Sequence, residues 1–387
     1  MIICKTNCMW NRPFWISRIE DAWQQTSVVW LSGVRRVGKT TLCQSLKNVD
    51  YFDCELPRVR QLLEDPEGFL RSRQDRRIVL DEIQRLPDPS EILKIAADHY
   101  PTVRVVATGS STLGASIKFR DSLTGRKKDI FLTPIPLVEL SDFQNDDLDH
   151  RARNGGLPAF FLVDGTPESD FQDWMDAFWA KDIQELFRLE RRASFQKFIE
   201  LLLIDSGGMF EATRFAAPCE VSRTTIANYL AVLEATHIVH VIKPFSTRRS
   251  NEIVSAPKVY AFDTGFICYY KGWLDLRPDD IGLMWEHLVL NEINAQLPGT
   301  RLHYWRDKSH HEVDFVIANR GRPPTFIECK RTASKFVDRT LQIFRKKYPA
   351  GKSYVVAMDV TTTFTRTYNG LEVSFTSLQQ LIDQLRI

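Results

Sequence analysis

The stretch from residue 33 to residue 40 constrains the fold more than any other part of the chain. It reads Gly33-Val34-Arg35-Arg36-Val37-Gly38-Lys39-Thr40 and fits the pattern G-x-x-x-x-G-K-T. An apolar run precedes it, and a helix-like stretch begins at Thr41. In this strand–loop–helix context the glycines allow successive backbone N–H groups to face an anion. The pattern predicts a loop that binds a nucleoside triphosphate, in which Lys39 reaches the outer phosphates and Thr40 holds Mg²⁺.

A second element of the same site follows at residues 77–82. The apolar residues 78–80 predict a buried parallel strand that delivers Asp81 to the carboxyl edge of the sheet, where open α/β sheets bind ligands. We expect Asp81 to hold Mg²⁺ through water. Glu82 is expected to polarise the attacking water.

A third apolar run, 104–107, ends in small polar side chains. Thr108 or Ser110 at its tip is a candidate sensor of the γ-phosphate, although a plain strand end explains the same letters. Together the three elements predict a site for ATP and Mg²⁺, with Lys39 and Glu82 in catalytic roles. The predicted nucleotide contacts are Gly33, Val34, Arg35, Arg36, Val37, Gly38, Lys39, Thr40, Thr41, Asp81 and Ser110.

Hydrophobic patterning divides the chain into four predicted parts of a multidomain α/β protein. Apolar runs alternate with helical patterns from residue 27 to residue 136, which favours a doubly wound parallel sheet. From Phe171 to Trp179 apolar residues recur at i, i+3, i+4, i+7 and i+8, which predicts one face of a helix. The predicted parts are an ATPase domain at 1–145, a helical lid or connector at 146–185, a winged helix-turn-helix at 186–250 and a further α/β domain at 251–387.

Residues 221–230 resemble the turn and second helix of a helix-turn-helix, with Ser222 as the N-cap. The pattern directs four apolar side chains inward: Ile226, Tyr229, Leu230 and Leu233. It directs four polar side chains outward, where a recognition helix meets a major groove: Arg223, Thr224, Thr225 and Asn228. Residues 238–242 and the basic residues 247–249 would form the wing. Two interpretations stay open, a DNA-binding element or a winged helix used for packing or protein contact.

The last third of the chain contains a second group of charged residues. Glu286 lies in a helical pattern, Asp314 lies in the strand-like stretch 312–317, and Glu328 and Lys330 lie in a second such stretch after a turn. An antiparallel hairpin would place Asp314, Glu328 and Lys330 on one face. With Glu286 the carboxylates could hold one or two divalent ions, Mg²⁺ or Mn²⁺, while Lys330 orients or deprotonates water. This chemistry suits phosphodiester cleavage; the alternative is a cluster that only binds metal or no longer catalyses.

Composition sets broad limits on the class of protein. The chain has 387 residues, 43% hydrophobic and 26% charged, which is typical of soluble globular domains. Lys and Arg number 51 against 49 Asp and Glu, so no overall field attracts nucleic acid or anionic lipid. Seven cysteines form no C-x-x-C pair, and nowhere do 18 apolar residues run together. We therefore expect a cytoplasmic protein with reduced thiols and no membrane partner.

Nearly the full length of the chain resembles a family of bacterial and archaeal AAA-type ATPases that carry a C-terminal domain of unknown function with a restriction-endonuclease-like core. The resemblance rests on the stretches 33–40, 79–84, 108–111, 122–126, 260–265, 304–306, 312–316 and 327–330. It implies a RecA-like P-loop ATPase, a winged helix and a PD-(D/E)XK-like nuclease domain, in that order. It also implies nucleotide roles for Gly38, Lys39, Thr40, Asp81 and Glu82 and metal roles for Glu286, Asp314 and Glu328, with Lys330 beside them. Arg126 is the candidate arginine finger from a neighbouring subunit, or else a surface arginine.

Two hypotheses about function follow. In the first, an ATP-hydrolysing protein, assembled as a homo-oligomer through its ATPase domain, controls a DNA-acting C-terminal module that is a Mg²⁺-dependent nuclease. In the second, the chain is a non-cleaving ATP-dependent switch whose winged helix binds DNA or a protein partner.

Overall fold

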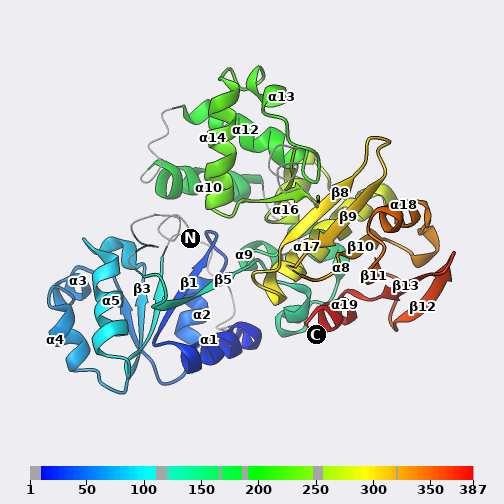
Figure 1. Cartoon of the computed structure of the whole chain (residues 1–387). Helices are drawn as coiled ribbons and strands as arrows, with labels where there is room; N and C mark the ends of the chain where they lie inside the picture. Colours follow the sequence, from blue (N-terminus) through cyan, green and yellow to red (C-terminus); the bar gives the residue numbers. More distant parts are fainter. Residues whose placement is uncertain are drawn as a thin grey trace.

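The computed structural model describes residues 10–109, 119, 121, 123–163, 165, 168–184, 191–246, 256–319 and 321–386. Figure 1 shows an N-terminal sheet with its helices, a group of helices from the middle of the chain, and a second sheet formed mainly by the last third.

The N-terminal part is built on a five-stranded sheet in the order β2-β3-β4-β1-β5. All four pairings are parallel, which confirms the predicted parallel α/β sheet. The strands are β1 (Val28–Gly33), β2 (Asp50–Asp53), β3 (Arg77–Asp81), β4 (Arg104–Thr108) and β5 (Lys127–Leu132). The helices are α1 (Pro13–Gln25), α2 (Lys39–Ser45), α3 (Pro57–Leu62), α4 (Pro66–Arg71) and α5 (Pro89–His99), with a 3₁₀ turn η1 (Ile83–Arg85).

Strand β1 lies inside this sheet and is buried along its whole length. Its side chains alternate between two hydrophobic cores, as a strand requires. Val29 and Leu31 pack in a core that also contains residues of α1 and α2, whereas Val28 and Trp30 pack in a core with α3, α4 and α5. The sheet is therefore covered on both faces, and its carboxyl edge stays available for a ligand.

A helical region follows the first sheet. It contains η2 (Leu137–Glu139), η3 (Ser141–Phe143), α8 (Leu148–Asn154), α9 (Pro158–Phe161), α10 (Glu168–Phe178), the π-helical turn η4 (Trp179–Ile183), α12 (Arg192–Ile204), α13 (Ala212–Ala216) and α14 (Arg223–Ala235). Phe171, Trp174, Met175 and Phe178 are the buried residues of α10, as the periodicity predicts. Ser222 caps α14, its Oγ accepting from Thr225 N at 3.1 Å.

The second sheet has eight strands in the order β12-β13-β11-β10-β9-β8-β6-β7. They are β6 (Val239–Pro244), β7 (Lys258–Ala261), β8 (Leu302–Arg306), β9 (Glu312–Ile317), β10 (Thr325–Lys330), β11 (Ser353–Ala357), β12 (Phe364–Tyr368) and β13 (Leu371–Thr376). The accompanying helices are α16 (Thr264–Lys271), α17 (Pro278–Gln296), η5 (Ala333–Lys335), α18 (Arg339–Lys347) and α19 (Leu378–Leu385). The predicted antiparallel hairpin of β9 and β10 is present.

Strands β6 and β7 connect the helical region to this sheet. They pair antiparallel with each other, and β6 pairs with β8 in parallel. The predicted boundary between the third and fourth parts, at position 250, therefore separates two strands of one sheet. Strand β6 precedes that position in the sequence and β7 follows it. The basic residues 247–249 expected in the wing lie outside the described residues.

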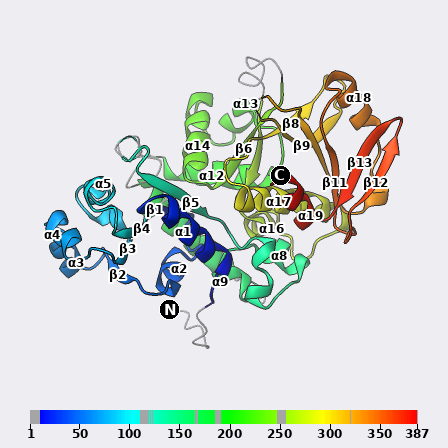
Figure 2. The same cartoon turned by 60° about the horizontal axis from the view of Figure 1, so that its bottom comes forward.

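Figure 2 shows the N-terminal elements beside the second sheet and its helices. Polar contacts join the two parts. Arg18 of α1 donates to the carbonyl of Gln296 in α17 at 2.7 Å. Glu292 of the same helix is buried and accepts from Leu137 N at 2.7 Å and from Val138 N at 3.3 Å. These contacts hold α17 against the end of the ATPase part, because an unpaired buried carboxylate would be costly.

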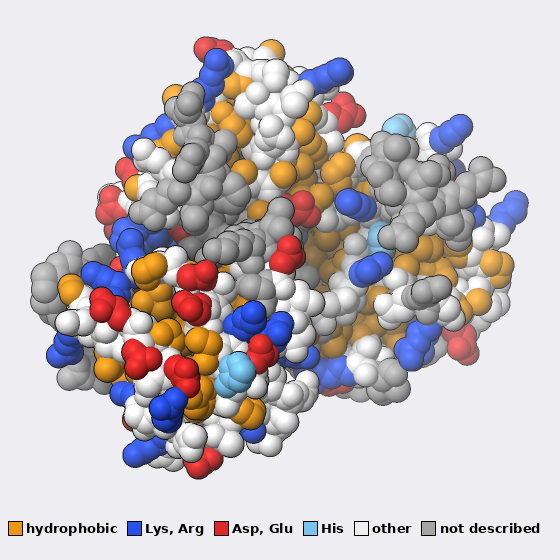
Figure 3. All heavy atoms as spheres, turned by 60° about the vertical axis from the view of Figure 1, so that its left-hand side comes forward, with side chains coloured by type: hydrophobic (Ala, Val, Ile, Leu, Met, Phe, Trp, Pro, Cys, Tyr) orange, Lys and Arg blue, Asp and Glu red, His pale blue; other side chains and the backbone are white. Residues whose placement is uncertain are grey.

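The surface is mixed in charge. On the face in Figure 3, acidic and basic side chains are interspersed. Among the residues that the structure describes, no helix is both long and apolar enough to cross a membrane.

Candidate functional site

The predicted phosphate-binding loop connects β1 to α2 at the carboxyl edge of the first sheet. Gly38, the N-cap of α2, has φ 98°, a left-handed conformation that glycine adopts without steric cost. The loop borders a cavity of about 690 Å³. Predicted residues that line it are Arg35, Arg36, Val37, Gly38, Lys39, Thr40, Thr41, Asp81 and Glu82. The structure therefore brings most of the predicted nucleotide contacts to one pocket.

Lys39 is folded back onto its own loop. Its Nζ donates to the carbonyls of Gly33 at 2.9 Å and Val34 at 3.3 Å. Burial lowers the pKa of Lys39, whereas the charge of Glu82 acts to raise it. The ammonium thus lies beside the cavity and is bound to two backbone carbonyls, from which it could turn to a phosphate.

Three hydroxyl groups surround the carboxylate of Asp81 at the end of β3. Thr40 Oγ1 donates to Asp81 Oδ2 at 2.9 Å. Tyr51 OH also donates to Oδ2, and Thr108 Oγ1 donates to Oδ1. A hydroxyl beside a carboxylate is an oxygen donor set that suits Mg²⁺, so Thr40 and Asp81 fit the predicted ion. Sequence reasoning did not identify Tyr51, which lies on the neighbouring strand β2.

Glu82 is held by its neighbours in an unusual backbone conformation. Its φ is 52°, in the left-handed region that few residues other than glycine adopt. The N–H of Glu82 donates to Thr108 Oγ1 at 3.1 Å, and Gln84 Nε2 donates to the Glu82 carboxylate. Strain of this kind occurs at functional sites, where the surrounding contacts maintain it.

The helical connector completes the pocket. Arg35 Nε donates to Asp182 Oδ2 of η4 at 2.9 Å, and Trp174 Nε1 of α10 donates to the Arg35 carbonyl at 3.0 Å. Pro158 and Lys181 also line the cavity. These residues lie more than a hundred positions from the loop, so no local pattern could have linked them to it.

A buried arginine from outside the motif also supports the phosphate-binding loop. Arg12 Nη1 donates to the carbonyl of Val37 at 3.0 Å, and its Nε donates to Glu139 Oε1 at 3.0 Å. Arg12 and Glu139 are both buried. No local pattern indicated this pair, because it joins two segments outside the motif.

Gly33, Val34 and Arg126 were predicted at the nucleotide site but do not line the described pocket. Arg126 precedes β5, at the edge of the sheet where β1 begins, and its Nε donates to Asp98 Oδ1 at 2.7 Å. The pocket lies at the opposite edge, so Arg126 could act as a finger only on a neighbouring subunit. Ser110 lies outside the described residues.

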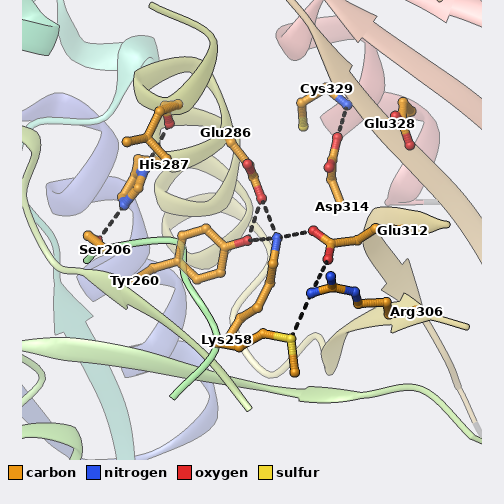
Figure 4. Close-up of polar contacts among 12 residues, drawn as sticks. Ser206, Lys258, Tyr260, Glu286, His287, Arg306, Glu312, Asp314, Glu328 and Cys329 are labelled. Atoms are coloured by element: carbon orange, nitrogen blue, oxygen red, sulfur yellow. Dashed lines mark hydrogen bonds and ion pairs between the residues drawn. The ribbon is translucent and has the colours of Figure 1, made fainter. Parts of the chain in front are cut away.

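The second group of charged residues gathers between α17 and the hairpin of β9 and β10 (Figure 4). Lys330 Nζ donates to Glu328 Oε1 at 2.7 Å, whereas Glu328 Oε2 is buried and has no hydrogen-bond partner among the residues that the structure describes. Asp314 Oδ2 accepts from Cys329 N at 2.7 Å. Glu286 Oε1 accepts from Tyr260 OH. In the part of the chain that the structure describes, no three His, Cys, Asp or Glu side chains are grouped closely enough to hold a metal ion.

Burial dominates the electrostatics of this group. It raises the pKa of Asp314 and of Glu328, and the nearby charge of Glu286 raises that of Asp314 further. The Asp314 charge in turn raises the pKa of Glu328. Carboxylates placed close together in a buried site resist simultaneous ionisation unless a cation compensates them.

Comparison with known families agrees with the geometry of the first site. Residues 25–141 match a family described as AAA domain. Residues 145–277 and 281–373 each match a domain of unknown function, DUF8612 and DUF4143 respectively. The first match, together with the loop and Asp81, supports a P-loop AAA-type ATPase domain. The other two matches assign no activity.

Similarity to individual proteins adds little about function. The chain is 29% identical over 343 residues to the uncharacterized protein Mb2031c of Mycobacterium bovis, covering 84% of this chain and 75% of the relative. Among solved structures, AMPPCP-bound DnaA from Aquifex aeolicus is 13% identical with a TM-score of 0.28, covering 60% of this chain and 89% of that one. The Bacillus subtilis DNA clamp loader delta protein is 11% identical with a TM-score of 0.25, covering 72% and 99%. Because both scores are low, the class of the first domain follows from the AAA domain match.

Proposed function

We propose that the chain binds and hydrolyses ATP and that the nucleotide state controls how its C-terminal part engages DNA. The observation that carries the proposal is the shared construction of the pocket. The phosphate-binding loop supplies Arg35 and Lys39, while the connector supplies Asp182 and Lys181. A ligand in this pocket contacts both parts, so it can favour one arrangement of them over another.

The pocket residues have distinct chemical roles. Lys39 binds the outer phosphates, Thr40 and Asp81 hold Mg²⁺, and Glu82 orients the attacking water. The bound ion would neutralise charge that develops on the phosphates. Tyr51 and Thr108 fix the Asp81 carboxylate, and Gln84 fixes that of Glu82. An Arg126 side chain from a neighbouring subunit would complete the site in a homo-oligomer.

The DNA-binding element of this proposal is a winged helix formed by α12, α13, α14 and the β6–β7 hairpin. Support comes from the exposure pattern of α14. Ile226, Tyr229, Leu230 and Leu233 are buried. Arg223, Thr224 and Asn228 are exposed. A helix with a packed inner face and a polar N-terminal outer face is suited to a major groove. A protein partner is the competing ligand for the same surface.

Measuring the ATPase rate with and without single-stranded, duplex and branched DNA tests the proposal. Stimulation by one of these DNAs, weakened by Arg223→Ala and by added salt, is the expected result. Glu220→Gln, at an exposed position just before the helix, serves as the control. A rate that no DNA changes, with no binding at low salt, would point instead to a protein partner.

A second candidate function is metal-dependent cleavage of DNA by the C-terminal part. It is favoured by helix α17 and the hairpin of β9 and β10, which carry Glu286, Asp314 and Glu328. It is also favoured by the unpaired Glu328 Oε2, an acceptor that a cation would satisfy. Glu286, Asp314 and Glu328 would hold Mg²⁺ or Mn²⁺. Lys330 would orient the water.

Incubation with DNA and either Mg²⁺ or Mn²⁺ tests this second candidate. Cleavage by the wild-type chain that disappears in Glu328→Ala would support it. Equal absence of cleavage in both proteins would reject it and leave the non-cleaving switch.

A further inference from the structure

One buried lysine lies among the C-terminal carboxylates and was not expected from the sequence. Lys258 begins β7 and is only 5% exposed. Its Nζ is 2.6 Å from Glu312 Oε1, 3.3 Å from Glu286 Oε1 and 3.3 Å from Tyr260 OH. Figure 4 shows the ammonium between the carboxylates of α17 and β9. An ammonium has three donors, and these contacts use all of them.

The surrounding groups make this lysine a bridge rather than a surface ion pair. Tyr260 OH accepts from Lys258 and donates to Glu286, so the three side chains form a closed set. The other oxygen of Glu312, Oε2, lies 3.6 Å from Arg306 Nη1, so Glu312 has a second positively charged neighbour. Burial by itself would lower the pKa of Lys258, but the charges of Glu286 and Glu312 raise it above its ordinary value.

The oxygen atoms that Lys258 contacts include one from the predicted metal ligand Glu286. A divalent ion and an ammonium compete for such oxygens, because either cation can neutralise the same buried carboxylates. Among the described residues, no three carboxylates are grouped closely enough to hold a metal ion. The side chains as they stand, with an ammonium among them, do not fit the predicted ion.

We propose that Lys258 is the resident cation of the C-terminal carboxylates and that it excludes a divalent ion from the space between Glu286 and Glu312. The lysine is a positioning residue, since it fixes the two carboxylates relative to each other. The inference stands apart from ATP hydrolysis and concerns the state of the second candidate site.

The backbone that carries Lys258 is attached to the helical region. Met209, which follows α12, forms a β-bridge with Lys258. Phe210 N donates to Pro257 O at 2.8 Å, and Gly207 N donates to Val259 O at 2.7 Å. These contacts fix the backbone of Lys258, and they hold its side chain beside Glu286.

Calorimetric titration of Mn²⁺ into the full chain without nucleotide tests the proposal. All proteins carry Asp81→Asn, which removes the carboxylate predicted to hold the ion in the first site. We expect Lys258→Met to bind Mn²⁺ at least about tenfold more tightly than the parent, and Lys258→Arg to behave as the parent. Adding Glu286→Gln to Lys258→Met should abolish the gain. Equal affinity in the parent and Lys258→Met, or a gain that survives Glu286→Gln, would overturn the proposal.

Thermal unfolding provides a second readout that applies even if Lys258→Met folds poorly. Lys258→Gln keeps a hydrogen-bond donor for Tyr260 but loses the charge. Its midpoint in EDTA should lie below that of the parent, because the buried carboxylates lack a counter-charge. Mn²⁺ should raise the midpoint of Lys258→Gln more than that of the parent. An equal response of the two proteins to Mn²⁺ would contradict a competition between lysine and metal.

Discussion

Arg35 of the phosphate-binding loop is paired with Asp182 of the helical connector at 2.9 Å, and the Asp182 side chain is only 7% exposed. The backbone carbonyl of Arg35 is also bound, by Trp174. A residue that would lie beside a bound nucleotide is thus fixed by the element that leads to the C-terminal part. Nucleotide binding and the position of the connector should therefore depend on each other.

Asp182→Asn should weaken this dependence. In the wild-type chain we expect ATP to slow amide hydrogen exchange of residues 168–184 by at least about tenfold, which corresponds to ~1.4 kcal/mol. The variant should lose most of that protection, because the charge that holds Arg35 is gone. Hydrogen exchange with mass spectrometry measures it. Asp176→Asn is the matched control. Asp176 lies in α10, directly before the turn that carries Asp182, and forms an exposed ion pair with Arg192 of α12. Equal protection in both variants would contradict the coupling.

Lys39→Ala should lose at least about a hundredfold in ATP affinity, because the ammonium supplies a charge-assisted contact to the outer phosphates. Titration with a fluorescent ATP analogue measures the change. Lys47→Ala removes an exposed lysine just beyond α2 and should bind as the wild type does. Undiminished affinity in Lys39→Ala would refute the assigned role.

Glu82→Gln should bind ATP with nearly unchanged affinity and hydrolyse it ~10² to 10³ times more slowly. Loss of a positioned base or water-orienting carboxylate has effects of this size. Steady-state phosphate release measures the rate. Glu91→Gln, an exposed position in α5, is the control. Normal turnover in Glu82→Gln would show that another group orients the water.

Arg12→Met should destabilise the chain by about 3 to 5 kcal/mol, because it leaves the buried Glu139 charge unpaired. Urea unfolding followed by tryptophan fluorescence measures the free energy of unfolding. Arg76→Met, at an exposed position before β3, should change it little. If the two variants were equally stable, the Arg12–Glu139 pair would not support the loop.

Acidification should destabilise the contact between the two sheets through His237, whose ring lies 4.1 Å from that of Phe131 between centroids. Burial lowers the pKa of His237 to about 4. Between the ordinary pKa of about 6.5 and this value, the unfolded chain binds a proton that the folded chain does not. Stability due to this residue is present above about pH 6.5 and is lost as the pH falls toward 4. His237 has φ 61°, a left-handed conformation that Asn tolerates. His237→Asn should therefore fold and should lose less stability than the wild type between pH 6.5 and about 4. If the two proteins lost the same stability on acidification, other groups would be responsible for the loss.

Local patterns in the sequence were sufficient for part of this structure. The motif at 33–40, the apolar strand before Asp81 and the periodicity of α10 depend on neighbours within a few positions, and each is confirmed as a structural element. The hairpin that brings Glu328 toward Asp314 was predictable for the same reason.

Contacts between distant segments could not be predicted in this way. Tyr51, Asp182 and Lys258 contact their sites only because separate elements pack together, and none of them lies in a recognisable pattern. Arg126 lies far from the pocket because β5 runs parallel to β1, so that the residue before β5 lies at the edge where the strands begin. The direction of β5 could not be read from the sequence, so Arg126 could not be excluded from the pocket. Lys258 contacts Glu286, one of the three predicted metal ligands, so its charge bears directly on the second site.

The most direct test of the proposed switch is DNA affinity measured in two nucleotide states. Fluorescence anisotropy with labelled DNA would compare Glu82→Gln with and without ATP and Mg²⁺, using Lys39→Ala as the control that cannot bind nucleotide. We predict that ATP changes the dissociation constant of Glu82→Gln by at least about tenfold and leaves that of Lys39→Ala unchanged. The same dissociation constant for Glu82→Gln in both states, with ATP shown to be bound, would contradict the switch.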